Sequence, residues 1–269
     1  MNTITTRALT AALVLGAGST CADTLTFTIE STMPAGGFFF TPFWIGVHNG
    51  GFDTYNTGEL SSNFPGLTSL AEVGNTGPLS SSFSMSPAGV AGGVQTTAVA
   101  LDMDAPVFSP GESTTFNLDI GDPAVNRYLS FASMVVPSND LFVGNDDPTA
   151  YMLFDNAGTF AGPLVIEIYG RDVRDNGTEV NSATNDAAFS TNDGQALPES
   201  AAIRPFFTDA GDTDYLNSFI GSTTANGATI NSVFAENDLI ARITINAVPA
   251  PGTVALFSSC GLLALRRRR

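Results

Sequence analysis

The sequence predicts an all-β protein built as an antiparallel β-sandwich. Short apolar runs recur between clusters of Gly, Pro, Asn, Asp and Ser, and the chain holds 27 glycines and 15 prolines. Only one weak helical stretch is visible, near Leu67–Val73. The sequence lacks a repeat of roughly 20–50 residues, which a propeller or a solenoid would show.

The predicted strands run from residue 24 to residue 245. In the first one, Leu25, Phe27 and Ile29 alternate with threonines, a pattern typical of a strand with one buried face. In chain order, the predicted strands are Thr24–Ile29, Phe43–His48, Val94–Met103, Ser113–Ile120, Tyr128–Val136, Ala150–Phe154, Leu164–Gly170 and Leu239–Ile245.

A long acidic loop, Asp175–Ala202, interrupts this pattern. It is rich in Asn, Asp, Thr, Ser and Ala and contains no convincing strand. Uninterrupted loops of that length are usually functional or disordered. We expect order near Asp175 and a mobile, solvated arm beyond it.

The charge of the chain is unevenly distributed. All 10 basic residues are arginine, and Arg7 and Arg266–Arg269 belong to the two ends. The body, residues 23–247, therefore contains five arginines and all 26 acidic residues, which gives it a formal charge of −21. The absence of lysine excludes a P-loop and Schiff-base chemistry, and the negative charge disfavours nucleic acid as a partner.

Residues 1–22 have the pattern of a secretory signal peptide. Arg7 precedes an apolar stretch, and Thr20 and Ala22 occupy the −3 and −1 positions of a cleavage site. We expect the mature chain to begin at Asp23. A lipoprotein anchored through Cys21 is the alternative.

Residues 248–269 combine a Val-Pro-Ala-Pro-Gly turn, an apolar stretch at Thr253–Leu265 and four terminal arginines. As a helix, the apolar stretch would span about 20 Å, less than the roughly 30 Å hydrocarbon core of a membrane. This arrangement resembles the PEP-CTERM sorting signal of Gram-negative bacteria, with Ala250 in place of the usual Glu. The resemblance implies export, processing by an exosortase and transient inner-membrane association through residues 253–265. A C-terminal core helix is the alternative.

Cysteine and histidine are too scarce for several kinds of site. Cleavage after Ala22 would leave Cys260 as the only cysteine, so the domain has no internal disulfide. His48 is the only histidine, which excludes multi-histidine metal sites. Without a Gly-x-Ser-x-Gly elbow, we interpret His48 as structural.

A calcium site would have to come from separate loops. EF-hand spacing fails at residues 172–183, where Arg174 takes the third position and Ala183 the twelfth. Loops that meet at one end of a sandwich can supply the six to eight oxygen ligands that Ca²⁺ takes.

Three stretches resemble the spondin N-terminal domain of the F-spondin and mindin type. Phe131–Gly144 carries a buried strand followed by a Pro-Ser-x-Asp turn, an aromatic residue and Gly. Thr41–His48 with Leu70–Gly74 matches the N-terminal half of that domain, and Asp175–Glu179 matches its Asp-x-Gly-Thr-acidic loop.

The resemblance implies a C2-like sandwich that holds one calcium ion through three acidic side chains. Asp140 and Asp175 match two of these ligands, and Asp119 is the candidate for the third, with Asp122 as its rival. From the residues alone, a structural role in a turn is the more common one for Asp140, and Asp175 can be a turn residue before Asn176 and Gly177.

These observations lead us to expect an exported calcium-binding adhesion or extracellular-matrix-type protein, associated with the cell surface or a biofilm, that acts through contacts and is not an enzyme. The expected partners are the exosortase and an acidic extracellular polysaccharide or a surface protein. A secreted carboxylate- or metal-dependent hydrolase is the alternative, and inert structural material is a third possibility.

Overall fold

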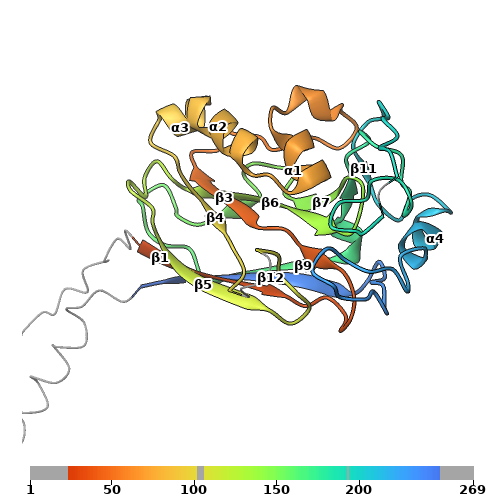
Figure 1. Cartoon of the computed structure of the whole chain (residues 1–269). Helices are drawn as coiled ribbons and strands as arrows, with labels where there is room; N and C mark the ends of the chain where they lie inside the picture. Colours follow the sequence, from red (N-terminus) through yellow and green to blue (C-terminus); the bar gives the residue numbers. More distant parts are fainter. Residues whose placement is uncertain (1–23, 102–105, 193, 249–269) are drawn as a thin grey trace, which may run out of the picture.

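The computed structural model describes residues 24–101, 106–192 and 194–248, and it shows two antiparallel sheets packed face to face (Figure 1). This arrangement confirms the predicted all-β sandwich. The predicted signal peptide, the C-terminal hydrophobic helix and the arginine cluster lie outside the described residues. Within those residues, no helix has both the length and the apolar character needed to cross a membrane.

The smaller sheet has four strands in the order β5-β1-β12-β9. Its central pair sets Phe27 opposite Ile245, and Phe27 also lies opposite Phe116 in the neighbouring strand. Leu25, Phe27 and Ile29 are fully buried, which confirms the predicted alternation. The strands are β1 (Thr24–Ser31), β5 (Ser113–Asp119), β9 (Leu164–Tyr169) and β12 (Leu239–Ala247).

The larger sheet has eight strands, with the main order β11-β10-β7-β6-β3-β4. Two short strands, β2 and β8, also pair with β6. The strands are β2 (Phe39–Phe40), β3 (Phe43–His48), β4 (Val94–Ala98), β6 (Tyr128–Val136), β7 (Leu141–Gly144), β8 (Tyr151–Met152), β10 (Arg174–Asp175) and β11 (Arg204–Pro205).

Helices cover the outer face of this larger sheet (Figure 1), so its central strands are buried on both sides. In β3, Phe43 and Ile45 join the core between the sheets, while Trp44 belongs to a second apolar cluster with helix residues such as Phe83. The predicted helix at Leu67–Val73 is confirmed as α1. The other helical elements here are η1 (Ser61–Asn63), α2 (Gly77–Met85) and α3 (Pro87–Val90).

The acidic loop closes one end of the sandwich. Single antiparallel bridges join Ser138 to Ala188 and Glu179 to Pro198, and Ala183 and Ala187 are buried in the core. The segment is thus packed against the sheets, in contrast to the solvated arm that we expected beyond Asp175. Nearby lie η2 (Gly170–Asp172) and α4 (Asp212–Asn217).

Candidate cation site

Asp140 lies in the turn that joins the two central strands β6 and β7. Ser138 closes this turn, because its hydroxyl donates to the carbonyl of Val135 and accepts a hydrogen bond from the backbone of Leu141 at 3.1 Å. Asp140 is fully buried. A carboxyl group is therefore held inside the protein at the start of β7.

Asp175 reaches the same place from β10, where it pairs with Leu141. The chain then turns at Gly177, which has a φ of +68° and whose added Cβ would lie 2.6 Å from the carbonyl oxygen of Ala201. A glycine is needed here because both the backbone conformation and the close approach exclude a side chain. This turn brings the backbone of Thr178 and Glu179 to Asp140.

The two oxygens of Asp140 differ in their surroundings. Oδ2 accepts hydrogen bonds from the backbone amides of Thr178, at 2.8 Å, and Glu179, at 3.1 Å, and from the Thr178 hydroxyl at 3.2 Å. Oδ1 is buried and, among the described residues, has no hydrogen-bond partner. One side of the carboxylate thus remains available to a ligand.

Burial, and after it the charge of Asp175, raise the pKa of Asp140 to about 7, although the hydrogen bonds from Thr178 and Glu179 lower it. Both effects penalise the ionised form. A cation near Oδ1 would favour ionisation, because it would offset the lost hydration and the repulsion by Asp175.

Asp175 is more fully engaged than Asp140. Its Oδ1 accepts a hydrogen bond from the backbone of Gly177 at 2.9 Å. Its Oδ2 accepts hydrogen bonds from the side-chain amide of Asn181 at 2.8 Å and from Nη2 of Arg204 at 2.7 Å. A cation would have to share this carboxylate with Arg204.

Arg204 also binds Asp212, through two hydrogen bonds of 2.8 Å each. Burial opposes the ionised form of Asp212, but the hydrogen bond from Arg204 and the one from the backbone of Asp209 together lower its pKa. The hydrogen bond that Arg204 donates to Asp212 is the largest influence that raises the pKa of Arg204. Asp212 is therefore neutralised by an ion pair with Arg204 that is partly shielded from solvent.

Glu179 brings a third carboxyl group to this end of the sandwich. Burial raises its pKa, and so does the charge of Glu72. The hydroxyl of Tyr215 is acted on by Asp140, Asp175 and Glu179, because all three charges add to the rise in its pKa that burial causes.

The structure does not bring Asp119 together with Asp140 and Asp175. Asp119 lies at the end of β5 opposite Thr24, in the smaller sheet and at the far end of the sandwich from β11 (Figure 1). Its Oδ1 accepts a hydrogen bond from the backbone of Gly121, and Asp122 bonds in the same way to Ala124. Both acids are exposed and act as turn residues.

Two residues of the site were missed by sequence reasoning. Glu179 had a signal, since it is the acidic residue of the Asp-x-Gly-Thr-acidic loop that already identified Asp175. Arg204 had none, because it follows Asp175 by 29 positions and reaches it only through the pairing of β10 with β11.

The donor set suits a hard cation in chemistry, although the carboxylates do not converge on one point. Within the described residues, no three His, Cys, Asp or Glu side chains are grouped so that they could hold a metal ion. Three side-chain oxygens at this end of the sandwich are, however, buried and have no hydrogen-bond partner among the described residues. They are Oδ1 of Asp140, Asn176 and Asn181. Carboxylate and amide oxygens are the ligands that Ca²⁺ takes.

No protein-family model matches the sequence, and no curated protein matches it. The resemblances to the spondin N-terminal domain and to the PEP-CTERM signal therefore remain predictions. The function is inferred from the residues of this chain and their geometry.

Proposed function

We propose that the protein is an exported calcium-binding protein of the adhesion or extracellular-matrix type, which acts through contacts with a surface or a biofilm. The observation that supports this best is the buried carboxylate of Asp140, which has one oxygen without a partner and a second acid, Asp175, beside it. Buried charges are normally paired or bound to a metal, because an isolated one is costly.

The calcium ion would be held by Asp140, with Asp175 and Glu179 as the neighbouring acids and with the side-chain oxygens of Asn176 and Asn181 as neutral donors. The ion supplies the positive charge that lets these acids stay ionised together. The residues of the chain do the rest: Gly177 turns the loop, and the amides of Thr178 and Glu179 hold Asp140 in place.

The two ends of the domain lie at the same end of the sandwich. Leu25 pairs with Ala247, so the described chain begins and ends side by side. This end lies opposite the one that carries β11 and α4 (Figure 1). While a tail at residues 253–265 rests in the inner membrane, before an exosortase processes it, the calcium site would face away from the membrane.

The proposed partners are an acidic extracellular polysaccharide, bridged by the bound calcium, or a protein on the cell surface. The body has a formal charge of −21, so it repels an acidic chain unless a divalent cation lies between them. Calcium would therefore provide both stability and a bridging charge.

Thermal melting of the full chain in calcium and in chelator tests the proposal. Sites in extracellular modules bind calcium with Kd values of about 10⁻⁴ to 10⁻³ M, so about 10 mM calcium would stabilise the fold by roughly 1.5–3 kcal/mol. Asp140→Asn should abolish the rise in Tm, whereas Asp119→Asn should keep it. The same Tm in calcium and in chelator would contradict the proposal.

A further inference from the structure

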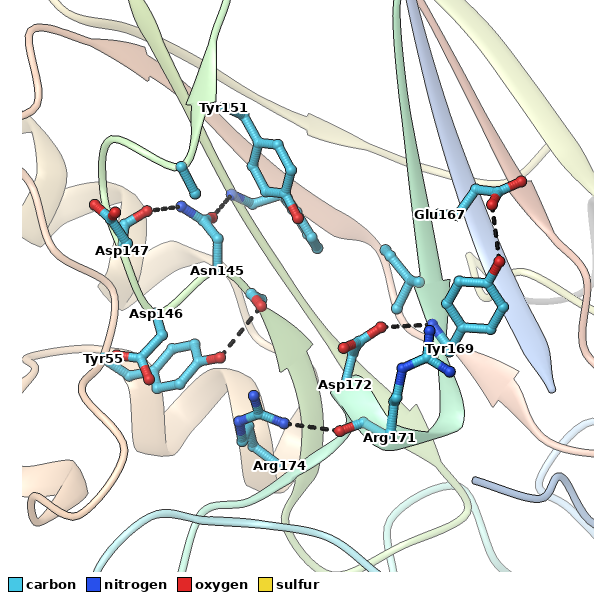
Figure 2. A pocket seen from close by; sticks show the side chains of 14 residues that line it. Tyr55, Asn145, Asp146, Asp147, Tyr151, Glu167, Tyr169, Arg171, Asp172 and Arg174 are labelled. Carbon is cyan, nitrogen blue, oxygen red and sulfur yellow. Dashed lines mark hydrogen bonds between the residues drawn. The ribbon is translucent and has the colours of Figure 1, made fainter. Parts of the chain in front are cut away.

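A second candidate binding site lies apart from Asp140, in a pocket of about 420 Å³ that Figure 2 shows from close by. The pocket is open to solvent. One side is formed by residues in and near β7 and β8 of the larger sheet, and the other by residues of β9 and η2. Its volume falls within the range of small-molecule sites, roughly 300–1,000 Å³. None of the calcium-site residues lines it.

Arg171 and Arg174 line this pocket, and neither forms an ion pair with a carboxylate of the described residues. Arg174 donates only to the backbone carbonyls of Arg171 and Val173, and its Nε is buried without a partner among the described residues. Arg171 lies over the ring of Tyr169, 4.1 Å from its centre, and donates to the side chain of Asn237. By contrast, Arg204 and Arg242 both form ion pairs.

Acids line the same pocket: Asp172 lies beside Arg171 in η2, and Asp146 follows β7 (Figure 2). Asp172 accepts one hydrogen bond, from the backbone of Tyr169 at 2.8 Å, and Asp146 accepts only long ones, of 3.3 and 3.4 Å, from the backbone of Thr57. Arg174, Asp146 and Asp172 all act on the buried hydroxyl of Tyr55: burial raises the pKa of Tyr55, Arg174 opposes the rise, and the two acids add to it.

Tyrosines supply part of the apolar lining, together with Phe131, Ala150 and Ile168. Tyr55, Tyr151 and Tyr169 come from three separate segments of the chain and border the same space (Figure 2). Tyrosine combines a flat apolar ring with a polar tip, which suits a ligand that has both a flat face and polar groups.

We propose that this pocket binds a neutral sugar residue of an extracellular glycan. Sugar hydroxyls both donate and accept, so they can satisfy unpaired arginine donors and free carboxylate oxygens at once. A sugar ring can pack on the half-buried ring of Tyr151, because Tyr55 is buried and Arg171 lies over Tyr169. An anionic ligand would meet four acids in the lining, Asp146, Asp147, Glu167 and Asp172, on a body of charge −21.

This inference rests on the proposed extracellular role for the kind of ligand, but it does not need calcium. A neutral sugar forms no ion pair, so its binding is insensitive to salt and to chelator. Binding of the acidic polysaccharide proposed above would instead be weakened both by salt and by chelator. The two proposals can therefore fail separately.

Saturation-transfer NMR and calorimetry on the full chain, in chelator, test the pocket. The probes are the methyl glycosides and disaccharides of glucose, galactose, mannose and N-acetylglucosamine, with glucuronate and galacturonate as the charged arm. We expect at least one neutral probe to bind with the same affinity in low and high salt. Arg174→Gln should weaken that binding about 10-fold or more, because hydrogen bonds to a charged donor are lost.

The matched control is Arg127→Gln. Like Arg174, Arg127 donates to a backbone carbonyl, that of Phe154 at 3.2 Å, but it does not line the pocket. If Arg174→Gln lowers the Tm, weaker binding could reflect a damaged fold. Asp146→Asn is then the second test variant, and it should also weaken the binding of the neutral probe. Binding of no neutral probe, binding of uronates only, or equal weakening by Arg127→Gln would overturn the inference. Sugar binding without a calcium effect on Tm would contradict only the calcium proposal.

Discussion

Nη2 of Arg204 lies 2.7 Å from Oδ2 of Asp175, so the carboxylate that the sequence predicts as a calcium ligand has a cationic partner within the chain. Arg204 is held there by Asp212 as well. Two positive charges on one carboxylate compete with each other. Arg204 therefore links the stability of the calcium-free fold to the affinity of the proposed site.

Replacing Arg204 by Gln should lower the free energy of unfolding in chelator by about 2–3 kcal/mol, because Asp175 and Asp212 stay buried without their cation. The side chain of Arg204 is 28% exposed, so we expect a smaller loss than for a fully buried pair. Urea denaturation measures it. Calcium titration of the same variant should show a higher affinity than the parent shows.

Arg242→Gln is the control for this experiment. Arg242 pairs with Glu30 and Glu167, and all three side chains are at least 35% exposed. Because solvent screens such surface pairs, the substitution should lower the free energy of unfolding by less than about 1 kcal/mol. Equal losses in the two variants, or weaker calcium binding by Arg204→Gln, would contradict the proposed competition.

Asp140→Asn should stabilise the calcium-free protein at high pH. The pKa of Asp140 is raised from 3.8 to about 7 in the folded state. Its stabilising contribution is complete below pH 3.8 and is lost as the pH rises through 7. The advantage of Asn over Asp should therefore be larger at pH 8 than at pH 5, by about 2–3 kcal/mol.

Urea denaturation in chelator at both pH values checks this expectation. Asn retains an acceptor oxygen for the amides of Thr178 and Glu179, so the turn can persist. Asp119→Asn, a change at an exposed acid in the other sheet, is the control variant. If Asp140→Asn changes the free energy of unfolding by the same amount at pH 5 and pH 8, the fold does not disfavour the ionised form of Asp140.

The identity of the third acid can be decided by comparing Glu179→Gln with Asp119→Asn. Glu179 shares the environment of Tyr215 with Asp140 and Asp175, whereas Asp119 lies opposite Thr24 in the other sheet. Glu179→Gln should reduce the calcium-dependent rise in Tm, because one charge of the site is lost. The reverse result, a loss in Asp119→Asn only, would restore Asp119 as the ligand.

His48 should stay neutral through the physiological range. Its ring is buried between the hydroxyl of Ser130, 2.9 Å from Nε2, and the backbone amide of Gly50, which donates to Nδ1. Burial lowers its pKa from 6.5 to about 4. The stabilising contribution of the neutral ring is complete above pH 6.5 and is lost as the pH falls through 4, at a cost of about 3 kcal/mol.

Because His48 is the only histidine, one NMR signal of its ring reports the titration directly. The signal should not shift between pH 7.5 and about 5.5. A midpoint near 6.5 would mean that the ring is solvated in the folded protein.

Local patterns were enough to predict most of the sandwich. Alternation in Thr24–Ile29 identifies a strand that is buried on one face, because every second residue is apolar. The mostly apolar run of Tyr128–Val136 identifies a strand that is buried on both faces. The helix α2 was missed, since Gly, Pro and Ser dominate it and its packing partners, such as Trp44, lie far away in the sequence.

The sequence by itself determined which residues could carry chemistry: a lysine-free acidic body, a Pro-Ser-x-Asp turn at Asp140 and an Asp-x-Gly-Thr-acidic loop at Asp175. Only the tertiary structure decided which acids meet. Strand pairing joins Asp175 to Leu141 and to Arg204, and it carries Asp119 to the opposite end of the other sheet. Such pairings depend on contacts between distant segments, whose register no local pattern contains.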